Sequence, residues 1–121
     1  MILLVEDEAI PRYGFAQNLR SEGYEVLEAM EGAEAIALLE KYSSRIDLVI
    51  TDLAMPKVNG LELIANIQAR WPKLRVIMLS AYMSQRGADS ILGQTAQFLP
   101  KPVRPSALMA AVRGMVLRPL Y

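Results

Sequence analysis

The sequence contains no cysteine and no histidine. The absence of cysteine excludes disulfides, thiolate catalysis and zinc sites built from cysteine, and it is compatible with the cytoplasmic location that we expect. The absence of histidine removes the side chain that most often acts as a general base near neutral pH. Any chemistry of this protein therefore rests on carboxylates, hydroxyls, lysine or arginine.

Neither sign of charge is in excess, because Lys+Arg and Asp+Glu both number 13 and the formal net charge is zero. Nucleic acids and anionic membranes are bound through a concentrated positive field, so this balance predicts no direct binding of nucleic acid. Long apolar runs are also absent. The apolar runs that do occur are too short to span a bilayer. The apolar start of the chain meets Glu6 and Asp7 before it could form a signal sequence. We therefore expect no membrane association.

The 121 residues are 53% hydrophobic, which suffices for a sizeable core, and we expect residues 1–121 to form a single domain. Short apolar runs alternate with longer segments of helical periodicity. Ile2 to Val5 is apolar throughout, as in a strand buried on both faces. The predicted strands are 2–5, 24–28 (an edge strand), 46–51, 75–79 and 97–99. The predicted helices are one between Pro11 and Gly23, one through Ala35 to Leu39, and 61–71, 84–95 and 105–117.

Five strand–helix units in succession predict a three-layer α/β fold, with helices on both faces of a parallel sheet, because each crossover is right-handed. Functional sites in such sheets lie outside the carboxyl ends of the strands. Those ends carry Glu6 and Asp7, then Asp52, then Ser80, then Lys101. We expect these five residues to line one rim of the sheet.

Three acids at one rim repel each other. Two unit charges about 4 Å apart repel by roughly 4 kcal/mol at an effective dielectric near 20. Because Lys101 alone cannot balance three carboxylates, the pattern predicts a bound cation, and an all-oxygen ligand set suits Mg²⁺. A carboxylate beside Mg²⁺ and a lysine can attack a phosphoryl group and become an acyl phosphate. Ser80 would then hydrogen-bond a phosphoryl oxygen.

Four short blocks of the sequence carry a family resemblance. They are Ile-Leu-Leu-Val-Glu-Asp at 2–7, Thr-Asp-Leu-Ala-Met-Pro at 51–56, Leu-Ser-Ala at 79–81 and Phe-Leu-Pro-Lys-Pro at 98–102. In order and spacing the chain resembles, over essentially its whole length, the receiver domains of two-component response regulators, chemotaxis regulators among them. The resemblance implies a flavodoxin-like fold with five parallel strands in the order 2-1-3-4-5.

The resemblance also implies roles for the acidic residues and their neighbours. Asp52 matches the phosphoacceptor of the family. Asp7 matches a direct Mg²⁺ ligand, and Glu6 a residue that holds the ion mostly through water. The backbone carbonyl of Ala54 matches a further ligand. The Lys101–Pro102 bond matches a cis peptide bond of the family, and Lys101 matches the lysine that pairs with the phosphoryl group.

The implied mechanism is a two-state switch. A phosphohistidine on a histidine kinase or histidine phosphotransfer protein donates to Asp52, Ser80 closes on the phosphoryl group, and Phe98 turns inward as the switch aromatic. The surface of helix 84–95, strand 97–99 and helix 105–117 then changes its preference for a downstream partner or output domain. We expect a monomer or weak dimer, and no enzyme beyond the promotion of its own phosphorylation and dephosphorylation.

Three other functions compete with this interpretation. An interaction module of the same fold could work without phosphorylation, although a complete acidic set would then only destabilise it. A flavin-binding protein of flavodoxin type would need a phosphate cradle after the first strand, where Glu6 and Asp7 repel phosphate. A phosphatase with an aspartate nucleophile would carry a second acid two residues after Asp52, where this sequence has Ala54.

Overall fold

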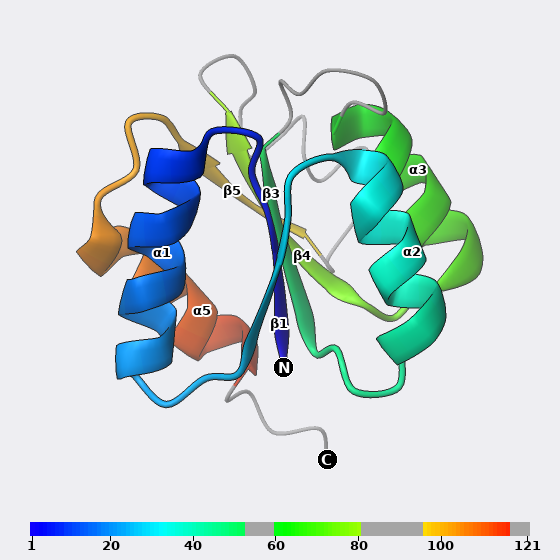
Figure 1. The fold of residues 1–121 in the computed structure, drawn as a ribbon, viewed down its shortest axis with the longest axis horizontal. Helices are drawn as coiled ribbons and strands as arrows, with labels where there is room; N and C mark the ends of the chain where they lie inside the picture. The colour runs from blue at the N-terminus through cyan, green and yellow to red at the C-terminus, as the bar shows by residue number, and fades with distance from the viewer. Residues whose placement is uncertain (53–59, 81–95, 117–121) are drawn as a thin grey trace.

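The structure is a computed structural model that describes residues 1–52, 60–80 and 96–116. Five strands form one parallel sheet in the order β2-β1-β3-β4-β5 (Figure 1). This order confirms the predicted flavodoxin-like α/β fold. The strands are β1 (Ile2–Val5), β2 (Val26–Ala29), β3 (Leu48–Asp52), β4 (Arg75–Ser80) and β5 (Ala96–Pro100), and the helices are α1 (Ala9–Ser21), α2 (Gly32–Tyr42), α3 (Gly60–Arg70) and α5 (Pro105–Val116).

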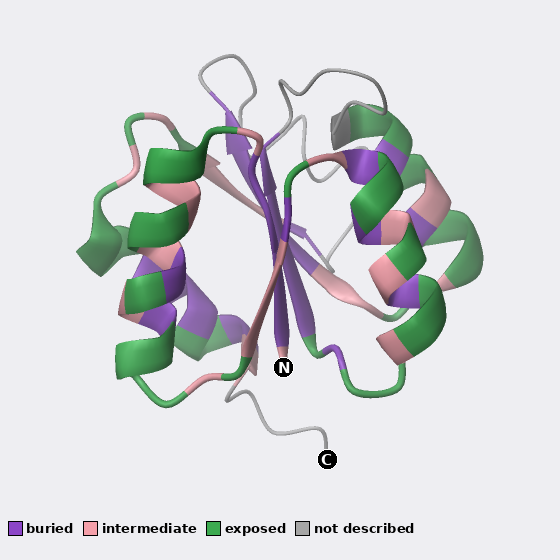
Figure 2. Cartoon of the chain, viewed as in Figure 1, coloured by how far each residue is buried: buried purple, intermediate pink, exposed green. Residues whose placement is uncertain are grey.

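The helices lie in two layers, with α1 and α5 on one face of the sheet and α2 and α3 on the other (Figure 1). The position of β1 between the two cores explains why its sequence is apolar throughout. Leu3 and Val5 belong to the core under α2 and α3, whereas Ile2 and Leu4 belong to the core under α1 and α5. Each of these side chains is at most 1% exposed, and burial of each one contributes about 2 kcal/mol. Figure 2 shows the central strands as the most buried part of the molecule.

The strand boundaries differ from the predicted ones by one or two residues. Backbone hydrogen bonds explain the later starts of β2 and β3. β2 begins at Val26 rather than residue 24, because Gly23 (φ 95°) and Tyr24 still close α1, with the Tyr24 N–H donating to the Leu19 carbonyl at 3.2 Å. β3 begins at Leu48 rather than residue 46, because the Ile46 N–H donates to the Tyr42 carbonyl at the end of α2, at 3.1 Å. The left-handed stop predicted at Gly23 is thereby confirmed.

β2 and β5 are the two edges of the sheet, and both are less buried than the central strands. The edge position predicted for the second strand is therefore confirmed. The helix predicted over 84–95, the loop before Gly60 and residue Leu117 fall outside the described residues. Within the described ranges, no helix is long and apolar enough to cross a membrane.

Candidate functional site

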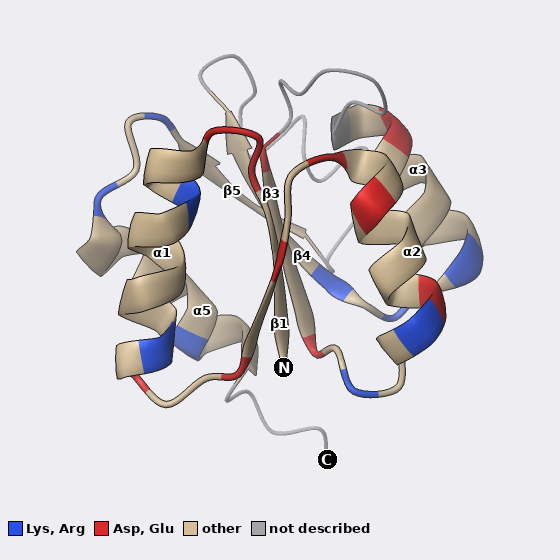
Figure 3. Cartoon of the chain, viewed as in Figure 1, with Lys and Arg blue, Asp and Glu red and all other residues tan. Residues whose placement is uncertain are grey.

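The register of the parallel strands brings the predicted site residues to one rim. Val5 lies opposite Thr51, so Glu6, which directly follows β1, comes beside Asp52 at the end of β3. Ser80 ends β4, and its backbone carbonyl accepts a hydrogen bond of 3.0 Å from the Lys101 N–H. That bond continues the pairing of β4 with β5 by one residue and fixes Lys101 beside Ser80. The acidic residues at this rim are coloured red in Figure 3.

The rim is acidic and largely buried. Glu6 and Asp52 are each 2% exposed and Ser80 is 6% exposed, whereas Asp7 is half-buried and Glu8 is exposed. Ionised carboxylates are rarely buried to this extent unless they are paired or bind a cation. Glu6 Oε2 accepts a hydrogen bond from the Glu8 N–H at 3.1 Å. The sequence therefore places two carboxylates in a position that is unfavourable unless positive charge compensates them.

Lys101 supplies part of that compensation. Its Nζ donates a hydrogen bond to Asp52 Oδ2 and forms an ion pair with it. Burial by itself would lower the pKa of Lys101, but the hydrogen bond to Asp52 and the negative charge of that residue outweigh burial, so the pKa is raised. The ammonium group is therefore charged throughout the neutral range.

Glu6 receives less compensation. Burial is the main reason that its pKa rises from 4.5 to about 7, and Asp7 and Asp52 raise it further. The N–H of Glu8 and the charge of Lys101 act in the opposite direction but do not offset these effects. Near neutral pH a substantial fraction of the Glu6 carboxyl is thus protonated, mainly because the group is buried.

These residues fit a divalent cation. Carboxylate oxygens of Glu6, Asp7 and Glu8 lie within 4.8 Å of one another, and Asp52 lies close enough to Glu6 to raise its pKa. All of these ligand atoms are oxygens, which Mg²⁺ prefers. Glu8 was not among the predicted ligands, although its place directly after two acids was a signal for it. The predicted carbonyl ligand of Ala54 lies outside the described residues.

A small cavity adjoins the Asp52–Lys101 pair. Its volume is about 230 Å³, and its walls come from the β1–α1 turn, α1, β4 and the segment after β5, including Glu6, Phe15 and Lys101. A second cavity of about 460 Å³ lies at the opposite, amino ends of the strands, between Ile46, Trp71 and Met115. It contains none of the predicted site residues, whereas Glu6 and Lys101 line the smaller cavity.

Two further residues named by the family resemblance lie within the described part of the chain, and the switch role of Phe98 stays a prediction. The Lys101–Pro102 peptide bond is cis. Phe98 on β5 is half-buried and packs against the core under α2 and α3. Sequence reasoning missed Arg12, whose Nη1 donates to the backbone carbonyl of Glu6 at 2.9 Å. A cation one turn into the helix that follows the acids was the only available signal for this contact.

Comparison with known proteins agrees with this geometry. The sequence pattern of the family described as "Response regulator receiver domain" matches residues 2–113. The chain is 34% identical over 116 residues to the "Sensor kinase CckA" of Brucella abortus, covering 95% of this chain and 12% of that protein. It is 38% identical over 112 residues to the "Transcriptional regulatory protein GlrR" of Escherichia coli, covering 92% of this chain and 25% of that protein.

Solved structures show the same likeness. The receiver domain of the hybrid histidine kinase CckA has a TM-score of 0.80 and 36% identity, covering 95% of this chain and 97% of that one. CheY in the CheX-CheY-BeF3-Mg complex of Borrelia burgdorferi has a TM-score of 0.84 and 29% identity, covering 93% and 86%. The chain spans only 12% to 50% of the length of curated relatives such as CckA, GlrR and the response regulator MprA.

Proposed function

Because the chain belongs to the response regulator receiver domains of two-component systems, we propose that it accepts a phosphoryl group on Asp52. The observation that carries this proposal is the pairing of a carboxylate that is 2% exposed with the Lys101 ammonium beside an acidic cluster. A buried, paired carboxylate can act as a nucleophile that is held in one orientation. The lysine ammonium lies beside it, where it would contact the oxygens of the phosphoryl group.

In the proposed reaction an Asp52 oxygen attacks phosphorus. A bond forms between that oxygen and phosphorus, and the bond between phosphorus and the donor's leaving group breaks, so the phosphoryl group moves as a unit and no separate base is required. Lys101 keeps its proton and shifts from the carboxylate toward the new phosphoryl oxygens. This use of the residues agrees with the absence of histidine from the chain.

Glu6, Asp7 and Asp52 are the side chains that would hold Mg²⁺, with the Ala54 carbonyl as a further predicted ligand. When bound, Mg²⁺ supplies positive charge that offsets both the carboxylates and the transferring oxygens. The protein's own contribution is to hold such oxygens close together, and this part of the proposal is supported for Glu6 and Asp7, whose carboxylate oxygens lie within 4.8 Å of each other and of a Glu8 oxygen.

The donor in the proposed function is a phosphohistidine of a histidine kinase or histidine phosphotransfer protein. Ser80 would approach the new phosphoryl group, and Phe98 on the adjacent strand would change its packing. The output would then be read on β5, α5 and the helix predicted over 84–95, by a downstream partner or output domain. The names of the relatives, which include a sensor kinase and transcriptional regulatory proteins, support partners of these kinds.

Labelling with acetyl phosphate and Mg²⁺ tests the proposal. Wild-type protein should take up the phosphoryl group, and Asp52→Asn should not. Asp47→Asn is the matched control, because Asp47 is an exposed aspartate that pairs with the N-terminal ammonium at 2.6 Å, away from the rim. Equal labelling of Asp52→Asn and wild type would show that Asp52 is not the acceptor.

A further inference from the structure

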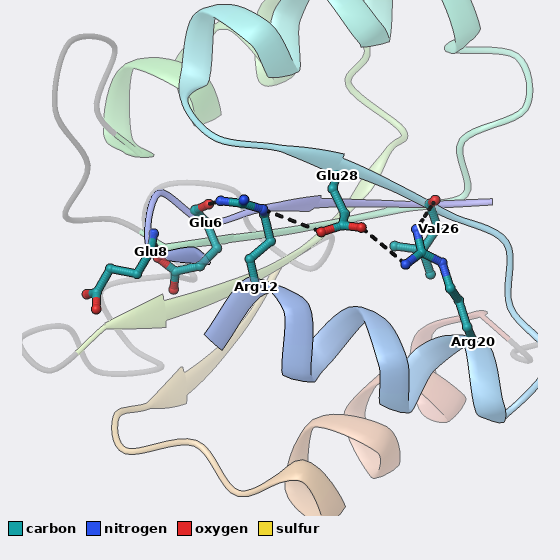
Figure 4. A network of polar contacts seen from close by, with 6 residues as sticks. All are labelled: Glu6, Glu8, Arg12, Arg20, Val26 and Glu28. Carbon is teal, nitrogen blue, oxygen red and sulfur yellow. Dashed lines mark hydrogen bonds and ion pairs between the residues drawn. The ribbon is translucent and has the colours of Figure 1, made fainter. Parts of the chain in front are cut away.

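Arg12, in the first half of α1, joins the acidic cluster to the edge strand β2 (Figure 4). Its Nη1 donates a hydrogen bond of 2.9 Å to the backbone carbonyl of Glu6. The N–H of the same Glu6 donates to the Ala29 carbonyl on β2 at 3.0 Å. The Glu6 backbone is therefore fixed on both sides at the point where β1 turns into the loop that carries Asp7.

The guanidinium of Arg12 is itself held in place by Glu28 on β2. Arg12 Nε lies 3.4 Å from Glu28 Oε1, and Glu28 Oε2 lies 3.1 Å from Arg20 Nη1. Arg20 Nη2 also donates to the Val26 carbonyl at 3.1 Å. The Arg12 side chain is 16% exposed and the Arg20 side chain is 47% exposed, so Arg12 is the inner member of this network. A planar guanidinium with a partner on each side loses most of its freedom to turn.

We propose that Arg12 is a positioning residue of the phosphoryl-transfer site. It fixes the β1–α1 turn so that Glu6 and Asp7 present their carboxylates in the geometry a divalent cation requires. The inference rests on the proposed function, because it concerns the ion that this site would bind. Arg12 acts through the backbone, since its contact at the site is with the Glu6 carbonyl. Groups that orient metal ligands typically change metal affinity about 10- to 100-fold when they are removed.

Three variants separate this role from general stabilisation. Arg12→Met keeps an unbranched apolar stem and removes the hydrogen-bond donors of the guanidinium group. Arg12→Lys keeps the charge but replaces the planar fork with a single ammonium group. Arg20→Met is the matched control, because Arg20 pairs with the same Glu28 and with a β2 carbonyl but does not contact Glu6.

Two measurements are made on each variant of the whole chain. One is the Mg²⁺ dissociation constant from calorimetric titration. The other is the hydrogen-exchange rate of the Glu8 amide in the metal-free protein, because that amide donates to Glu6 Oε2 at 3.1 Å and reports whether the turn is held.

We expect Arg12→Met to weaken Mg²⁺ binding about 10-fold and to speed exchange of the Glu8 amide by a comparable factor. Arg12→Lys should fall between Arg12→Met and wild type, and Arg20→Met should stay within about twofold of wild type for both quantities. Glu28→Gln should weaken Mg²⁺ binding in the wild-type background and should have no further effect in the Arg12→Met background. If Arg12→Met does not fold, Arg12→Lys and Glu28→Gln carry the test.

Equal Mg²⁺ affinity of wild type and Arg12→Met would overturn the inference, even with faster amide exchange, because Arg12 would then serve stability alone. A wild-type protein that binds no Mg²⁺ would instead refute the proposed function. The positioning role of Arg12 would then be overturned as well, because the ligands that it orients would bind no ion, whereas equal affinities in proteins that do bind Mg²⁺ would overturn the role of Arg12 alone.

Discussion

Lys101 Nζ donates to Asp52 Oδ2, and the two partners differ in exposure, with the lysine side chain 33% and the aspartate side chain 3% exposed. The pair thus joins a buried carboxylate to a cation that still reaches solvent. In the proposed reaction, an incoming phosphoryl group would meet the lysine without opening of the core.

Lys101→Met should destabilise the protein, because it removes the ammonium partner of a buried carboxylate. We expect a loss of about 2 kcal/mol at pH 7, below the 3–5 kcal/mol of a fully buried pair, because solvent screens the lysine. In an Asp52→Asn background the same substitution should change stability by less than about 0.5 kcal/mol. Urea unfolding of the four proteins measures both values, and an equal loss in the two backgrounds would mean that the pair does not carry the effect.

Mg²⁺ should stabilise the folded protein, because the unfolded chain does not bring the carboxylates of the β1–α1 turn together. At a Mg²⁺ concentration 100 times the dissociation constant, the gain should be about 2.7 kcal/mol. Thermal unfolding with and without millimolar Mg²⁺ measures it. Asp7→Asn should lose most of the gain, whereas Asp47→Asn should keep it. An unchanged melting temperature in wild-type protein would count against a metal site.

Stability of the metal-free protein should fall as the pH rises from about 4.5 to about 7, because of Glu6. The folded state binds the Glu6 proton more tightly than the unfolded state does, so this contribution is complete below about pH 4.5 and is lost by about pH 7. The change in pKa from 4.5 to about 7 corresponds to at most about 3 kcal/mol.

Glu6→Gln isolates that contribution, because glutamine keeps a carbonyl acceptor for the Glu8 N–H but does not titrate. Urea unfolding in EDTA across this pH range should show a wild-type stability that declines relative to Glu6→Gln. Asp7, Glu8, Asp52 and Lys101 remain in both proteins, so their direct contributions largely cancel in the difference. A constant difference between the two proteins across the range would contradict the prediction.

Two glycines near α1 should respond to alanine in opposite directions. Gly23 has φ 95°, a left-handed conformation that alanine adopts only with strain, so Gly23→Ala should destabilise by about 1 kcal/mol. Gly14 lies exposed within α1, and no neighbouring atom of the described residues comes within 4 Å of the place that an alanine methyl would occupy. Gly14→Ala should therefore stabilise by about 0.5–1 kcal/mol. Chemical denaturation measures both, and destabilisation by Gly14→Ala would show that the helix surface there is not open.

The order of the elements could be predicted from the sequence because buried parallel strands and amphipathic helices leave different local patterns. The run at β1 and the glycine at residue 23 are examples, since each is determined by its immediate surroundings. Strand ends were less certain. The sequence predicts that Ile46 starts a strand, yet its N–H donates to the Tyr42 carbonyl at the end of α2. Apolar character alone does not distinguish the first residue of a strand from a residue that closes a helix.

The members of the rim were predictable, but the contacts that hold them were not. Glu6 and Lys101 directly follow strands and Asp52 ends one, and parallel topology carries strand ends to one edge. The contact of Arg12 with the Glu6 carbonyl depends on the rotation of α1 about its axis and on Glu28 from another strand. No local periodicity encodes such a three-part arrangement. The raised pKa of Glu6 is likewise a property of the assembled cluster.

The most direct test of the central claim is to locate the phosphoryl group by chemical trapping. Protein treated with acetyl phosphate and Mg²⁺ is reduced with borohydride, which converts an aspartyl phosphate into homoserine, and the peptides are sequenced by tandem mass spectrometry. We predict homoserine at position 52 in the treated wild-type protein. Homoserine at position 7 instead, or none at all, would contradict the assignment of Asp52 as the phosphoacceptor.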